Sequence, residues 1–83
     1  MSESRKKYGE RKFSIYVLSP DRRFIGGEED LEKAKAEARG AALASRDSRG
    51  QKIRMAEVWD NKRSRPVYSV ERKHGGHLEE HHE

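Results

Sequence analysis

The chain has no cysteine and few apolar residues. Only 31% of its 83 residues are hydrophobic, whereas 41% are charged. The absence of cysteine excludes a disulfide-stapled scaffold, and no apolar run approaches the roughly 20 residues that a membrane-spanning helix needs. No apolar stretch follows the basic N-terminus, so a secretory signal is not predicted. We therefore expect one small cytoplasmic domain without a membrane partner.

Groups that could carry out catalysis are also scarce. All four His residues fall within residues 74–82, so the rest of the chain offers no imidazole to a Ser nucleophile. Glu57 lies inside a predicted strand, where a cross-strand ion pair with an Arg is its expected role. Gly26-Gly27 is followed by three acidic residues, which would repel a bound phosphate. We expect no enzymatic activity, no cofactor and no metal site.

Positive charge is unevenly distributed along the chain. The net charge is +4, but residues 1–12 alone contribute +3 and residues 47–73 contribute +4. Residues 74–83 contribute −3, and the middle of the chain is nearly neutral. A basic balance of this kind favours a polyanionic partner, although small domains also carry charge simply to stay soluble.

Four segments have the composition of β-strands, because they are rich in β-branched and aromatic residues. They are residues 13–18, 23–25, 52–59 and 66–72. The first has apolar side chains on both faces, which is typical of a central strand. Gly26-Gly27 is expected to end the second. In the third, Ile53 and Met55 define one face and Ala56 and Val58 the other, so we expect either two covered faces or a bulge.

The segment after Gly27 has the spacing of an amphipathic helix. Its apolar stripe consists of one Leu, four Ala and one Ser, in the order Leu31, Ala34, Ala38, Ala41, Ala42 and Ser45. Gly27 is the expected N-cap, and Gly50 can end the segment in a left-handed conformation. A stripe of such small residues lets the helix approach a sheet closely. We expect Trp59 or Tyr16 to fill the space that the alanines leave.

These elements predict one α+β domain over residues 12–73. Its order is β-β-α-β-β, with a four-stranded, mainly antiparallel sheet and one helix packed on one face. The expected spatial order of the strands is second, first, third, fourth. Residues 1–11 are expected to form a flexible basic arm. Residues 74–83 are expected to form a disordered tail, which we interpret as the remnant of a purification tag rather than a native metal site.

A single helix cannot cover both faces of a sheet, so one face is expected to stay open. Tyr16 and Leu18 lie on the same face of the first strand, and their side chains would leave that surface apolar. The first functional prediction is therefore a protein-interaction module. It would form a homodimer or bind a partner protein through the open sheet face, with Tyr16 and Leu18 in the contact.

The second prediction is a nucleic-acid-binding accessory protein without sequence preference. Lys62, Arg63 and Arg65 lie at the tip of the predicted second hairpin, and Arg54 lies on the strand before it. These four residues are the candidate phosphate contacts, with the basic N-terminal arm as a further contact. Steep weakening of binding with salt would distinguish this function from self-association.

Overall fold

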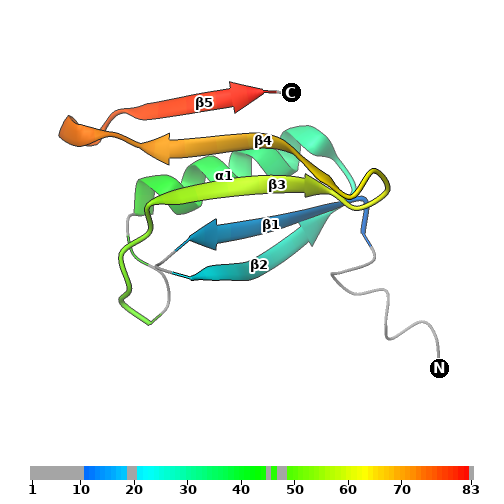
Figure 1. The fold of residues 1–83 in the computed structure, drawn as a ribbon, viewed down its shortest axis with the longest axis horizontal. Coiled ribbons are helices and arrows are strands. Elements are labelled where there is room, and N and C mark those ends of the chain that lie inside the picture. Colours follow the sequence, from blue (N-terminus) through cyan, green and yellow to red (C-terminus); the bar gives the residue numbers. More distant parts are fainter. Residues whose placement is uncertain (1–10, 19–20, 45, 47–48, 83) are drawn as a thin grey trace.

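Five strands and one α-helix make up the computed structural model, which describes residues 11–18, 21–44, 46 and 49–82. In chain order the elements are β1 Phe13–Leu18, β2 Arg22–Glu28, α1 Leu31–Ala44, β3 Met55–Asp60, β4 Arg65–Arg72, a 3-10 helix His74–Gly76 and β5 Leu78–His82. The strands form one antiparallel sheet in the order β2-β1-β3-β4-β5, and α1 lies across one face (Figure 1). The α+β class and the predicted order of the first four strands are confirmed.

Strand β1 is central, as its two apolar faces predict. It pairs with β2 on one side and with β3 on the other. Ile15 and Val17 are fully buried on the face that α1 covers, while the alternation of the strand turns Tyr16 and Leu18 to the opposite face. The helix therefore covers the set that begins at Phe13, and the other set lies on the open face.

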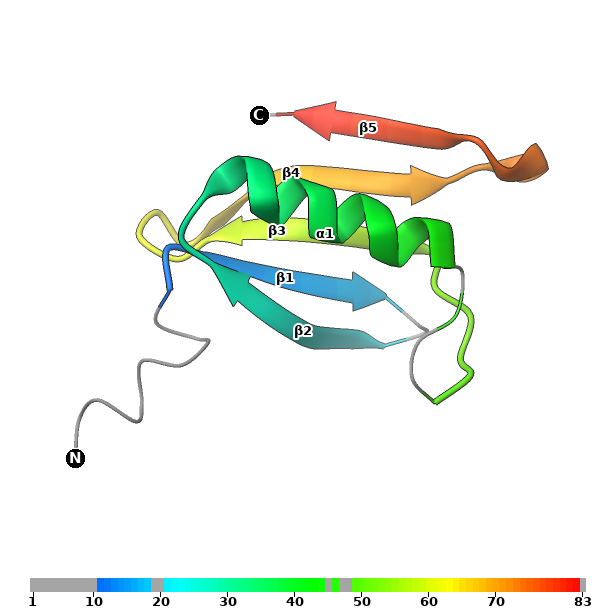
Figure 2. The same cartoon turned by 180° about the vertical axis from the view of Figure 1, so that it is seen from behind.

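The helix lies over one face of the sheet (Figure 2), and it packs there through the predicted alanine stripe. Ala34, Ala38 and Ala42 are completely buried. The helix begins later than Gly27, because Asp30 acts as its cap: the Asp30 carbonyl accepts from the amide of Ala34 at 3.0 Å, and the amide of Glu32 lies 3.4 Å from Asp30 Oδ1. A carboxylate at this place also suits the positive end of the helix dipole.

The expectation that Trp59 or Tyr16 fills the space beneath the alanines is wrong. The alternation of β3 turns Ala56 and Val58 toward α1 and turns Trp59 to the open face. The large side chain beneath the helix is Tyr68 of β4, which is 2% exposed and pairs with Val58 in the register. The completed core consists of Ile15, Val17, Ala34, Ala38, Ala42, Ile53, Ala56, Val58, Val67, Tyr68 and Val70.

Strand β2 is longer than predicted, because Gly26-Gly27 lies inside it. The two glycines pair with Ile15 and Ser14, and the register shifts just beyond them, between Ile15 and Tyr16 of β1. A Cβ placed on Gly26 would lie 3.5 Å from Glu37 Oε1 of α1. The small residues therefore leave room for the helix side chain that crosses above the strand.

The apparent change of phase in the third strand has a simple origin. Ile53 precedes β3 and belongs to the loop, although it is buried. Within β3 the alternation is regular from Met55 to Asp60. The irregularity lies instead in the pairing with β4, where the register shifts between Val58 and Trp59.

The C-terminal segment differs from its prediction in two ways. The sheet has five strands rather than four, and most of the segment is ordered rather than a disordered tail. Residues 78–82 form β5, which pairs with β4 as a fifth strand. Gly75 and Gly76 have φ values of 87° and 89°, and they turn the chain back along β4. The Tyr68 hydroxyl donates to Glu80 Oε1 at 2.6 Å, and the Tyr68 and His82 rings lie 5.0 Å apart. The origin of this segment in a tag stays a prediction, and the predicted arm lies outside the described residues except for Arg11.

Candidate functional site: the open face of the sheet

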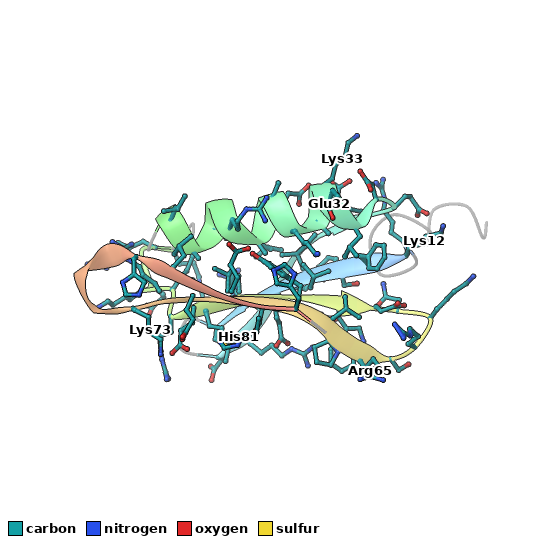
Figure 3. The ribbon with its side chains drawn as sticks, turned by 90° about the horizontal axis from the view of Figure 1, so that it is seen from above. Lys12, Glu32, Lys33, Arg65, Lys73 and His81 are labelled. Atoms are coloured by element: carbon teal, nitrogen blue, oxygen red, sulfur yellow. The ribbon has the colours of Figure 1, made fainter. Side chains whose placement is uncertain are left out.

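The face of the sheet turned away from α1 carries large side chains from three neighbouring strands. They are Tyr16 and Leu18 of β1, Arg22 and Phe24 of β2, and Met55, Glu57 and Trp59 of β3. Figure 3 shows the sheet nearly edge-on, with α1 on one side only. We refer to these seven residues as the open-face cluster. The structure thus places Tyr16 and Leu18 on the same uncovered surface.

Arg22 lies at the centre of the open-face cluster. Its guanidinium carbon is 4.0 Å from the centre of the Tyr16 ring and 4.8 Å from the centre of the Trp59 ring. Its Nη2 atom also forms an ion pair with Glu57 Oε1 at 3.2 Å. One cation therefore joins side chains of all three strands through cation–π contacts and an ion pair.

The aromatic part of the cluster extends to the edge strand. The Phe24 ring meets the Tyr16 ring edge-on, with the ring centres 5.7 Å apart. Phe24 is 39% exposed, which is high for a large apolar side chain. Tyr16, Leu18, Met55 and Trp59 are each half-buried. The cluster is ordered by its own contacts and still presents apolar surface.

A polar network fixes one end of this face. Asn61 Nδ2 donates to the Arg11 carbonyl at 2.6 Å and to Ser14 Oγ at 2.8 Å, and the Asn61 amide donates to the Lys12 carbonyl at 2.9 Å. Ser14 is 1% exposed, so this contact satisfies a buried hydroxyl. The tip of the second hairpin is thereby tied to the start of β1.

The half of the open face formed by β4 and β5 is charged rather than aromatic. Glu71, Glu79 and His81 place ligand-type atoms within 4.8 Å of one another. Lys73 Nζ lies 3.4 Å from Glu71 Oε1 and 3.1 Å from Glu79 Oε1. These ion pairs raise the pKa of Lys73 and hold the pKa of Glu79 below its ordinary value. One ammonium group therefore bridges the two carboxylates and offsets one of their two negative charges.

The hairpin tip holds three of the four predicted phosphate contacts. Lys62, Arg63 and Arg65 are all exposed. Asp60 Oδ1 shapes the turn, since it accepts from the amides of Lys62 at 2.9 Å and Arg63 at 3.2 Å. Ser64 completes the turn with a φ of 55°.

Arg54, the fourth predicted phosphate contact, lies far from Lys62, Arg63 and Arg65. It precedes β3, where its amide donates to the Leu18 carbonyl at 2.9 Å and its carbonyl accepts from Arg72 at 3.3 Å. Strand β3 runs from this end of the sheet to the hairpin tip, so its whole length separates Arg54 from Lys62. Figure 3 shows the same separation between Lys73, which follows β4, and Arg65 at the tip.

Sequence reasoning did not assign Arg22, Phe24, Glu57 and Trp59 to the open face. The alternation Arg22–Phe24 in β2 and Glu57–Trp59 in β3 is visible in the sequence. In each strand, alternate residues point to opposite faces of the sheet. The pairing register decides which of these two groups lies on the same face as Tyr16, and the register depends on contacts between distant segments. The expected ion pair of Glu57 with an Arg is present, and its partner is Arg22.

Comparisons with protein-family models, with curated proteins and with solved structures find no match to this chain. Within the described residues, no helix is both long enough and apolar enough to cross a membrane.

Proposed function

We propose that this protein is a small non-enzymatic interaction module that associates with a second copy of itself through the open face of its sheet. The observation that carries the proposal is the open-face cluster, where Trp, Tyr, Phe, Met and Arg side chains lie together on the uncovered surface. These residue types are enriched in protein interfaces, and Trp, Tyr and Arg dominate their binding energy.

The contacts of Arg22 favour a protein partner over nucleic-acid bases. A base stacks on the face of an aromatic ring, and here the guanidinium already lies over Tyr16 and Trp59. Glu57 adds a carboxylate at the same place. A protein surface can pack against such a preformed group without displacing Arg22.

A second copy fits because the face has one aromatic half and one charged half. The β2–β1–β3 half is aromatic, with Arg22 paired to Glu57, while the β4–β5 half carries Glu71 and Glu79 with Lys73 between them. In an isologous dimer the same patch meets itself. A two-fold axis parallel to the strands would place β2 of one copy over the β4 side of the other.

The area of the open face sets the expected affinity of the dimer. Five strands about 4.8 Å apart and six residues long cover about 20 by 20 Å, or roughly 400 Å² per copy. Stable interfaces bury about 800 Å² per partner, so the dimer is expected to be weak and dependent on concentration.

Replacing Leu18 with Lys tests the proposal. Leu18 lies on the open face at the end of β1, so a charge there should leave the fold intact and disfavour a buried contact. We expect the wild-type protein to show a concentration-dependent mass increase by sedimentation velocity at moderate salt. In Leu18→Lys the dissociation constant should rise at least about tenfold.

The matched control is Leu43→Lys. Leu43 is 61% exposed and lies on α1, away from the open face, so the same chemical change there should not alter the mass distribution. A wild-type protein that stays monomeric into the millimolar range, or equal losses in the two variants, would refute self-association through this face.

The nucleic-acid function stays a prediction. The exposed Lys62, Arg63 and Arg65 support it, whereas the separation of Arg54 from them reduces the predicted contact site to three cations.

A further inference from the structure

A second cluster of basic side chains lies at the end of the sheet opposite the hairpin tip. It surrounds a cavity of about 420 Å³ between the loop before β3 and the turn between β4 and β5. The cavity is lined by Arg46, Lys52, Ile53, Arg54, Glu71, Arg72, Lys73, Gly75 and Gly76. Five of these nine residues are cations, and one is an acid.

Main-chain contacts between separate segments bring the cations together. Arg46 and Lys52 form an antiparallel bridge across the loop, and the Arg72 amide donates to the Arg54 carbonyl at 3.3 Å. Loop residues and the end of β4 therefore hold four basic side chains around one space. Their backbone positions are set by hydrogen bonds rather than by the charges themselves.

Among the described residues, no acid pairs with four of the five cations of this cluster. Elsewhere in the fold the cations pair with acids, as in Arg22–Glu57 and Arg39–Glu80. Within the part of the chain that the structure describes, no carboxylate pairs with Arg46, Lys52, Arg54 or Arg72.

The acids near this cluster leave it strongly positive. Lys73 lies between two carboxylates, 3.4 Å from Glu71 Oε1 and 3.1 Å from Glu79 Oε1, so it offsets one of their two negative charges. With the four remaining cations, the cavity and Glu79 beside it carry a net charge of about +3. Gathering like charges in one place costs free energy, which a bound anion would recover.

The guanidinium groups also keep free donors. Arg46 Nη1 donates to the Gly50 carbonyl at 2.8 Å, and Arg72 Nη1 lies 3.5 Å from the Leu43 carbonyl. Each guanidinium has five N–H groups, so one such bond orients it and leaves the others for a ligand. Glycines line the opposite wall: a Cβ on Gly76 would lie 4.0 Å from Arg72 Nη2, and one on Gly75 would meet nothing within 4 Å. The glycines therefore leave this wall of the cavity without side chains.

We propose that this cavity binds a phosphate-bearing anion, with Arg46, Lys52, Arg54 and Arg72 as the binding residues. Guanidinium and ammonium groups in this number suit a doubly or more highly charged phosphate group. The group could be supplied by a free phosphate compound or by the backbone of a nucleic acid. The site is separate from the open-face cluster and does not depend on self-association.

Titration with sodium pyrophosphate, followed by amide chemical shifts, tests the site. Sodium chloride of equal ionic strength controls for charge screening. We expect saturable shifts at Arg54, Arg72, Gly75 and Gly76. The variant with Lys52→Gln and Arg54→Gln should bind at least about tenfold more weakly, because it loses two charge-assisted contacts.

The matched control carries Lys12→Gln and Lys33→Gln, two lysines that Figure 3 places toward the end of the molecule that holds the hairpin tip. It loses the same net charge away from the cavity, and its affinity for pyrophosphate should change less than about twofold. All four positions are exposed, so both variants should keep the native spectrum. Equal losses in the two variants, or no saturation at low salt, would overturn the proposal.

A second arm of the experiment distinguishes the source of the phosphate. The probe is a single-stranded oligonucleotide. If it binds the wild type more tightly than pyrophosphate does, and binds the Lys52/Arg54 variant more weakly, the ligand of this site is a nucleic acid. If pyrophosphate binding saturates but the oligonucleotide binds no more tightly, the ligand is a free phosphate compound.

Discussion

At the residue scale, two carboxylates meet where α1 crosses β2. Glu28 ends β2 and Glu37 lies on α1. Burial raises the pKa of Glu37 from 4.5 to about 7, and a hydrogen bond with Glu28 and its negative charge act in the same direction, while Arg11 opposes them. The folded state thus keeps a proton that the unfolded chain releases at lower pH. The free energy of unfolding should therefore fall as the pH rises from 4.5 to about 7.

The variant Glu37→Gln tests this contribution. Glutamine is neutral at every pH, so the variant should be more stable than the wild type above pH 7 by about 1 kcal/mol, after allowance for the solvent exposure of the side chain. Below pH 4.5 the two proteins should unfold alike. Urea denaturation at both pH values gives the measurement. Glu32→Gln is the control, because the Glu32 side chain is 76% exposed and its near neighbour is Lys35. A variant without any gain at high pH would contradict the raised pKa.

At the scale of elements, local patterns and distant contacts differ in how far sequence predicts them. The alanine stripe of α1 is a local spacing, and Ala34, Ala38 and Ala42 are buried as it predicts. The fifth strand could not be predicted in this way, because Leu78–His82 is polar and gains its order from Tyr68 of the neighbouring strand. The same holds for the candidate site. Tyr16 and Leu18 were predicted on one face, but the register that adds Arg22 to them is a long-range property.

Removing residues 77–83 tests whether β5 belongs to the folded domain. In the intact chain Leu78 packs against the core, and the Tyr68 hydroxyl donates to Glu80 at 2.6 Å. The deletion should expose part of the Tyr68 ring and lower the free energy of unfolding by about 1–3 kcal/mol. Urea denaturation followed by Trp59 fluorescence provides the measurement. An unchanged unfolding midpoint would instead agree with a disordered tail, and Glu80→Gln, which keeps the strand, serves as the milder comparison.

At the scale of the whole molecule, charge divides the surface into regions. Among the described residues, exposed cations gather at the two ends of the sheet: Lys62, Arg63 and Arg65 at the hairpin tip, and Lys52, Arg54 and Arg72 at the opposite end. Figure 3 marks these two ends by Arg65 and Lys73. Between them lies the open-face cluster, where Arg22 is neutralised by Glu57. A polyanion would therefore meet the ends of the molecule first, whereas a protein partner would meet its middle. The two predicted functions thus use different surfaces and can be tested separately.

The variant with Lys62, Arg63 and Arg65 all changed to Gln tests the hairpin tip. If this end contacts nucleic-acid phosphates, affinity should fall about equally for unrelated DNA and RNA sequences, because a turn without a base-reading helix touches only the backbone. The slope of log affinity against log salt should fall by about one for each lost phosphate contact. Stability should barely change, since exposed charges contribute little to folding. Fluorescence anisotropy at two or more salt concentrations measures both quantities, and the Lys52/Arg54 variant shows how much the opposite end contributes. The salt slope is proportional to the number of phosphate contacts, whatever the nucleic-acid sequence. An unchanged slope in the triple variant would therefore show that the hairpin tip does not contact the nucleic acid.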